Sequence, residues 1–115
     1  MTVIYHNPRC SKSRRTLELL TENNIQPTII NYLDTPPTKE ELTHVLQLLG
    51  QQPPDIIRFG EKIANDLNLS VHDQREFNEW LEIMIKHPIL IERPIVINEN
   101  KAIMGRPPEN VLKII

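Results

Sequence analysis

An α/β fold is predicted for this chain of 115 residues from three observations. Short apolar runs suited to strands lie near both ends of the chain, at residues 3–5, 28–33, 95–97 and 102–104. Segments with the periodicity of amphipathic helices separate the two groups, and most of the 10 prolines fall between the periodic segments. Ordinary proportions of apolar residues (39%) and charged residues (24%) suit a soluble chain with one domain, expected to span residues 1–115.

The first part of the fold is predicted to be β-α-β. The apolar run at 3–5 suits a buried strand, and Asn7-Pro8 breaks it before a helix that places Leu17 and Leu20 on one face. The run at 28–33 is the second strand. Because two strands joined by a helix usually pair in parallel, we expect a parallel pair here.

Helices fill the middle of the chain. Thr38 and Glu41 form a capping box before apolar positions at helical spacing, and Gly50 ends that helix. Residues 55–67 predict a further helix, which Gly60 weakens. These segments are interpreted as a helical insert.

The last part of the chain predicts one more helix and then a β-β-α half. Asp73 with Glu76 repeats the capping signal at the start of the helix. The runs at 95–97 and 102–104 flank a polar turn and predict an antiparallel hairpin, and Pro107-Pro108 opens a short closing helix. A β-α-β half and a β-β-α half with a helical insert between them make a thioredoxin-like domain.

Composition excludes several classes of function. The net charge of -2 leaves no basic footprint for nucleic acid or for an anionic membrane surface. One cysteine permits no intramolecular disulfide, and the first residues contain neither a signal peptide nor a membrane-spanning run, so a cytoplasmic location is expected. The histidines show no metal-ligand spacing, and no metal site is predicted.

Cys10 is the candidate for chemistry because it lies between the first strand and the first helix. Unpaired N–H groups and the positive dipole end of a helix stabilise a thiolate there. The first acidic residue after Cys10 is Glu18, whereas four basic residues surround the thiol. Those basic residues are Arg9, Lys12, Arg14 and Arg15. A buried, inert thiol is the alternative interpretation of a single cysteine.

Three residues near Cys10 are expected to support the thiolate. His6 and Arg14 stand at equal spacing on either side of it, and both can point at the sulfur. Ser13 occupies the place of the second cysteine in a C-x-x-C pair, and its hydroxyl is expected to donate a hydrogen bond to the sulfur. Without a second cysteine, an outside thiol such as glutathione or a glutaredoxin must release any covalent intermediate.

Four blocks of sequence carry a resemblance to a known family. They are His6-Asn7-Pro8-x-Cys10-Ser11-x-Ser13-Arg14, Tyr32-Leu33-x-Thr35-Pro36-Pro37, His87-Pro88-Ile89-Leu90-x-x-Arg93-Pro94-Ile95-Val96 and Gly105-Arg106-Pro107. With these blocks the chain resembles the ArsC-like proteins, the glutaredoxin-coupled arsenate reductases. Its length is similar to that of the short chromosomal members.

The resemblance implies an enzyme that reduces arsenate to arsenite through a thiol-arsenate adduct on Cys10. It implies that Arg58, Arg93 and Arg106 bind the arsenate oxygens, with Arg58 placed by its position in the predicted helix at 55–67. Pro94 would be the cis-proline usual in thioredoxin-like folds, facing the thiol. Glutathione would be the co-substrate and glutaredoxin the partner, with no bound cofactor.

Two other functions remain open. The same family includes redox-responsive transcription regulators that bind RNA polymerase without catalysis, but these usually carry C-x-x-C, whereas Ser13 replaces the second cysteine here. The C-x-x-S spacing also suits a glutathione-dependent thiol transferase. For Arg93 and Arg106, a surface ion pair is the alternative to substrate binding.

Overall fold

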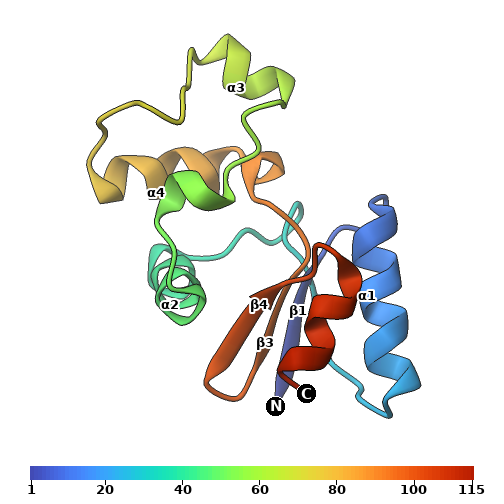
Figure 1. Ribbon diagram of the computed structural model, residues 1–115. Helices are drawn as coiled ribbons and strands as arrows, with labels where there is room; N and C mark the ends of the chain where they lie inside the picture. The colour runs from blue at the N-terminus through green and yellow to red at the C-terminus, as the bar shows by residue number, and fades with distance from the viewer. The chain divides into compact units, whose positions relative to one another are not determined.

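The computed structural model describes residues 1–115, which form two compact units (Figure 1). The sheet unit comprises Met1–Thr35 and Arg93–Ile115, and the helical unit comprises Pro36–Glu92. The helical insert predicted between the two halves of the fold is therefore a compact body of its own. That the whole chain behaves as one domain stays a prediction.

A four-stranded sheet with strand order β2-β1-β3-β4 forms the centre of the sheet unit. Its strands are β1 (Thr2–His6), β2 (Thr28–Asn31), β3 (Ile95–Asn98) and β4 (Lys101–Met104). Strand β1 pairs with β2 in parallel and with β3 antiparallel, and β3 and β4 form the predicted hairpin. The second strand ends earlier than expected because the amides of Asp34 and Thr35 turn back to the carbonyl of Asn31.

Two helical segments pack on one face of this sheet. Helix α1 (Ser11–Glu22) and the closing helix η3 (Pro108–Lys113) lie side by side, and η3 is a 3-10 helix (Figure 1). The core beneath them consists of buried apolar side chains from both helices and from β1 and β3, namely Ile4, Leu19, Leu20, Val96 and Val111. This core fixes the start of α1 relative to β1, the strand that precedes it.

The helical unit contains α2 (Lys39–Leu49), η1 (Pro53–Ile56), α3 (Lys62–Asp66), α4 (Phe77–Lys86) and η2 (Pro88–Leu90). The predicted capping box of Thr38 and Glu41 is present, and Gly50 ends α2 in the left-handed conformation with φ of 68°. Apolar side chains of α2 and α4 are buried, among them Leu42, Leu46, Trp80, Leu81 and Met84. No helix in the chain has both the length and the apolar character needed to cross a membrane.

Two helix boundaries differ from the prediction. Residues 55–67 are not one helix, because Ile57 leaves the helical conformation to form a β-bridge with Ile91, and α3 begins only at Lys62. Helix α4 begins at Phe77 with its capping box one turn later than expected, between Glu76 and Glu79. The carboxylate of Asp73 instead accepts hydrogen bonds from the Ser70 amide and the Arg75 side chain.

Candidate active site

The single thiol lies where β1 ends and α1 begins. Cys10 is the N-cap residue of α1, with extended backbone angles (φ -94°, ψ 121°), and its carbonyl accepts the Arg14 amide at 3.0 Å. The Cys10 amide donates to the carbonyl of Asn7 at 3.0 Å, and the Asn7 side chain accepts the Arg9 amide at 3.0 Å. These turns hold Cys10 half-buried at the helix start, as the sequence predicted.

Opposing effects act on the pKa of Cys10, and their sum lowers it. Burial is the largest single effect and raises the pKa, because a thiolate is less well solvated inside the protein. Hydrogen bonds from the Ser13 amide, the Arg93 guanidinium and the Lys12 amide, together with the positive charge of Arg93, outweigh that effect. The first turn of α1 contains no acidic residue to oppose them. The site therefore stabilises the thiolate more than an ordinary solvent-exposed cysteine would.

Two arginines that are distant in sequence converge on this sulfur. Arg106 Nη1 lies 3.9 Å from Cys10 Sγ and donates to the carbonyl oxygen of Arg93 at 3.1 Å. The hairpin explains the convergence, because Ile95 and Met104 pair at its open end and the arginines lie two residues outside that pair. The structure thus brings together Cys10, Arg93 and Arg106, all within the sheet unit.

The loops that carry these arginines each contain a cis proline. The peptide bond between Arg93 and Pro94 is cis, as the family resemblance implied, and the bond between Arg106 and Pro107 is cis as well. The carbonyl of Pro94 accepts the Gly105 amide at 2.9 Å, which ties the two loops together. Both guanidinium groups therefore extend from one connected piece of backbone.

His6 and Ser13 form a buried pair behind the thiol. His6 Nδ1 lies 2.6 Å from Ser13 Oγ, which also accepts the Asn7 amide at 3.0 Å. The expectation that the Ser13 hydroxyl donates to the thiolate is wrong, since this hydroxyl faces His6 and Asn7 and the Ser13 amide contacts the sulfur instead. Burial, and next the charge of Arg14, lower the pKa of His6, so its imidazole is neutral near pH 7.

Arg14 supports the loop before Cys10. Its Nη1 donates to the carbonyl oxygen of Pro8 at 2.9 Å, in an exposed position. The guanidinium thus fastens the first turn of α1 to the segment that follows β1.

Arg58 belongs to the helical unit and lies between η1 and α3, not within a helix as predicted. Its Nη1 donates to the Glu92 carboxylate at 2.6 Å, and both side chains are about a quarter exposed. The Arg58 amide donates to the carbonyl of Leu90 at 2.7 Å. Its Nε is buried without a hydrogen-bond partner.

Sequence reasoning missed three contributors. The Lys12 amide was not singled out as a donor to the sulfur, Glu92 was not recognised as the partner of Arg58, and Gly105 was quoted only as part of a motif. The Lys12 amide could have been predicted, because Cys10 was already expected at a helix start, where the first amides are unpaired. The other two follow from contacts between residues that are distant in sequence.

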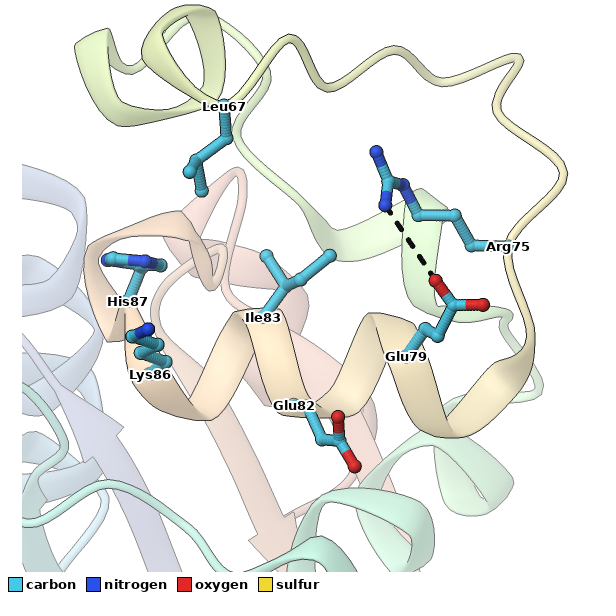
Figure 2. Close-up of a pocket in the computed structure, with 7 residues that line it drawn as sticks. All are labelled: Leu67, Arg75, Glu79, Glu82, Ile83, Lys86 and His87. Carbon is cyan, nitrogen blue, oxygen red and sulfur yellow. Dashed lines mark ion pairs between the residues drawn. The ribbon is translucent and has the colours of Figure 1, made fainter.

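A separate cavity of about 310 Å³ lies in the helical unit (Figure 2). Leu67 and Ile83 supply apolar surface, and Figure 2 shows Arg75 and Glu79 directed toward one another. Arg75 Nη1 lies 3.8 Å from Glu79 Oε2, which makes the two an ion pair. The Arg75 guanidinium also bonds Asp73 at 3.2 Å. This cavity contains no thiol, and its arginine is already engaged by two carboxylates, so it is not the candidate active site. The structure contains no group of three or more His, Cys, Asp or Glu side chains arranged to hold a metal ion.

The fold and the position of the single thiol define the class, an α/β protein of thioredoxin-like fold with a cysteine at the start of its first helix. The comparison with known families then gives the particular group. Residues 5–114 match the ArsC family, and the chain belongs to that family.

Relatives of nearly the same length are close in sequence and in structure. The chain is 44% identical over 113 residues to the uncharacterized protein YfgD of Escherichia coli, covering 97% of this chain and 94% of that protein. It is 44% identical over 114 residues to an arsenate reductase of Haemophilus influenzae, covering 98% and 97%. The solved structure of an arsenate reductase from Vibrio cholerae superimposes with a TM-score of 0.92 at 46% identity, covering 99% of this chain and 97% of that one.

Proposed function

We propose that this chain is an arsenate reductase in which Cys10 attacks arsenate. The observation that carries the proposal is the convergence of Arg93 and Arg106 on a thiol with a lowered pKa. Relatives named arsenate reductase, at about 40% identity over nearly the whole chain, support it. In this proposal Arg93 and Arg106 bind the arsenate oxygens, and His6, Ser13, Arg14 and Pro94 support the site. A substrate-binding role for Arg58, which pairs with Glu92 in the helical unit, stays a prediction from the family resemblance.

Guanidinium groups suit this substrate chemically. Arsenate is a tetrahedral oxyanion, and a planar guanidinium donates paired hydrogen bonds that match two of its oxygens. The Lys12 and Ser13 amides at the start of α1 add a second source of positive potential. The same groups that stabilise the thiolate therefore attract the anion it attacks, which places nucleophile and substrate side by side.

In the first step the Cys10 thiolate forms a sulfur–arsenic bond, and one arsenate oxygen leaves as water after it is protonated. Reduction of As(V) to As(III) takes two electrons, which two thiols supply as they become a disulfide. Glutathione adds to the arsenic of the adduct through its sulfur and displaces a second oxygen as water. The glutaredoxin thiol then attacks the glutathione sulfur, so that these two thiols become a mixed disulfide and the electron pair of the sulfur–arsenic bond stays on arsenic. Water breaks the remaining bond between arsenic and Cys10, which releases arsenite and returns Cys10 to the thiol. The overall products are arsenite, a disulfide and water.

An external reductant follows from the cysteine count. Cys10 is the only cysteine in the chain, so no second thiol of the same molecule can resolve the adduct. We therefore propose glutathione as co-substrate and glutaredoxin as protein partner, with no bound cofactor, in the reducing environment of the cytoplasm.

A coupled assay tests this function. Purified protein is supplied with arsenate, glutathione, glutaredoxin and glutathione reductase, and arsenate-dependent oxidation of NADPH is followed. We expect turnover that is lost in Cys10→Ser. Turnover no greater than that of the Cys10→Ser variant contradicts the proposal.

The same reagents separate the alternative functions. Replacing arsenate by a glutathionylated disulfide measures thiol transfer, and rapid turnover of that substrate without arsenate reduction would favour a glutathione-dependent thiol transferase. Capture of an RNA polymerase subunit by a protein inactive in both assays would favour the regulator.

A further inference from the structure

Gly105 lies in a space that has no room for a side chain. A Cβ atom placed there would be 2.7 Å from Pro94 Cγ and 2.7 Å from Thr16 Oγ1, well inside the usual contact distance of about 3.5 Å or more. The φ angle of Gly105 is not in the left-handed region. The requirement for glycine at position 105 is therefore steric and does not come from the backbone conformation.

Neither neighbour of Gly105 can easily move. Pro94 is a closed ring, and its carbonyl is held by the Gly105 amide at 2.9 Å. Thr16 is fully buried in α1, and its hydroxyl donates to the Lys12 carbonyl at 2.8 Å. A methyl group at position 105 must therefore displace the backbone that carries it, because interiors packed this tightly adjust by shifting neighbours.

That backbone carries both arginines of the candidate site. Gly105 immediately precedes Arg106, and through the carbonyl of Pro94 it is bonded to the residue that follows Arg93. Arg106 Nη1 reaches the Arg93 carbonyl at 3.1 Å and the Cys10 sulfur at 3.9 Å. A shift at position 105 therefore changes the distance from both guanidinium groups to the sulfur.

We propose that Gly105 is a positioning residue: the absence of a side chain there lets the Pro94 and Arg106 loops close on α1, which brings Arg93 and Arg106 to the sulfur of Cys10. The catalytic consequence rests on the proposed arsenate reduction. The expected effect on the Cys10 thiol does not depend on the proposed function, because the thiol is titrated in the protein without substrate.

The test compares two glycine-to-alanine variants. In Gly105→Ala we expect the pKa of Cys10, followed by thiolate absorbance without arsenate, to rise toward its ordinary value, because the arginines withdraw. We also expect kcat/KM for arsenate to fall by about 10- to 100-fold, as small misplacements near reacting groups do. Gly60→Ala is the control, since a Cβ at that position meets nothing within 4 Å.

A second variant separates positioning from loss of folding. Gly105→Ala combined with Thr16→Ala removes the Oγ1 contact at 2.7 Å and the Cγ2 contact at 3.2 Å, leaving only Pro94, and should recover part of the lowered thiol pKa. An unchanged thiol pKa in Gly105→Ala overturns the proposal, even if the melting temperature falls. Should the unsubstituted chain fail to reduce arsenate, the proposed function fails, but the thiol titrations still decide the role of Gly105.

Discussion

At the scale of the residue, the reactivity of Cys10 depends on hydrogen bonds to one sulfur atom. Two donors are backbone amides of the first turn of α1, which form whenever the helix forms. The other two are the guanidinium groups of Arg93 and Arg106, which come from the C-terminal part of the chain. Together they outweigh the desolvation that partial burial imposes.

The contribution of Arg93 can be measured directly. In Arg93→Gln the thiol pKa of Cys10 should rise, because one of two charged donors is lost while the two amides and Arg106 remain. The rate of alkylation by iodoacetamide, measured across pH, follows the thiolate fraction. Arg15→Gln is the control, since Arg15 pairs with Glu18 and Glu22. Superimposable alkylation profiles for Arg93→Gln and the unsubstituted protein would show that Arg93 does not stabilise the thiolate.

His6 predicts a pH dependence of stability. The pKa of His6 in the folded protein lies below the ordinary histidine value of 6.5, so the unfolded chain binds a proton more readily than the folded protein as pH falls. The free energy of unfolding should therefore be highest above pH 6.5 and decline below it, as protonation of His6 becomes favourable only in the unfolded state. Urea unfolding at neutral and mildly acidic pH measures this decline. In His6→Gln the decline should be smaller, and an equal decline in both proteins would contradict the assignment.

At the scale of the element, the start of each helix has its own function. The N-cap residue of α1 is Cys10, whose side chain makes no capping hydrogen bond, so the first amides of the helix remain available to the sulfur. The N-cap residue of α2 is Thr38, which makes both bonds of a capping box, so the backbone amides at this helix end are satisfied locally. The start of α2 thus stabilises its own helix, whereas the start of α1 leaves amide donors available to the Cys10 sulfur.

The capping box makes a prediction for stability. Thr38→Ala removes the side-chain oxygen that accepts the Glu41 amide at 3.1 Å, and it should lower the free energy of unfolding by about 1 kcal/mol. Urea denaturation gives the value. Thr43→Ala is the control within the same helix, because its hydroxyl bonds only to the Lys39 carbonyl one turn back and its loss should change stability by less than about 0.5 kcal/mol. Equal effects of the two substitutions would argue against the cap.

The ion pair of Arg58 and Glu92 ties η1 to the end of the helical unit. Both groups are about three-quarters buried, and the backbone joins the same segments through the Glu92 amide and the Ile56 carbonyl at 2.8 Å. Glu92→Gln keeps the shape but removes the charge opposite Arg58. We expect a loss of about 1 kcal/mol by urea denaturation, reduced at high salt because ions screen partly exposed pairs. A stability difference independent of salt would contradict this electrostatic origin.

At the scale of the whole molecule, two compact units share one chain that passes between them twice. Each has its own buried apolar residues, such as Leu20 in the sheet unit and Leu81 in the helical unit, both fully buried. Units this small bury a limited share of their surface, which makes independent stability marginal. We therefore expect them to unfold in one transition.

Matched substitutions test that expectation. Leu20→Ala and Leu81→Ala each leave a cavity in one unit and should each cost about 2–5 kcal/mol. If the molecule is one cooperative domain, either substitution shifts a single calorimetric transition to lower temperature. Two transitions, of which each variant moves only one, would show that the units unfold separately.

Several features were predictable from sequence because their signals are local. The capping box at Thr38, the left-handed Gly50 and the placement of Cys10 at a helix start each depend on residues within about one or two helical turns. The β3–β4 hairpin follows from two apolar runs and the polar turn between them. Family membership was also recognisable, since the blocks of residues around Cys10 and Arg93 are in the sequence itself.

What the sequence determined by itself, then, is the β-α-β and β-β-α order of the two halves and the position of the single thiol between the first strand and the first helix. Only the tertiary structure decided that Arg106 reaches that thiol across 96 residues, that the Ser13 hydroxyl turns to His6, and that Ile57 leaves a helix to pair with Ile91. The physical reason is the separation in sequence between the residues that interact. Local conformation is set by neighbours along the chain, whereas the contacts that organise the site form only once strand pairing and core packing bring distant segments together.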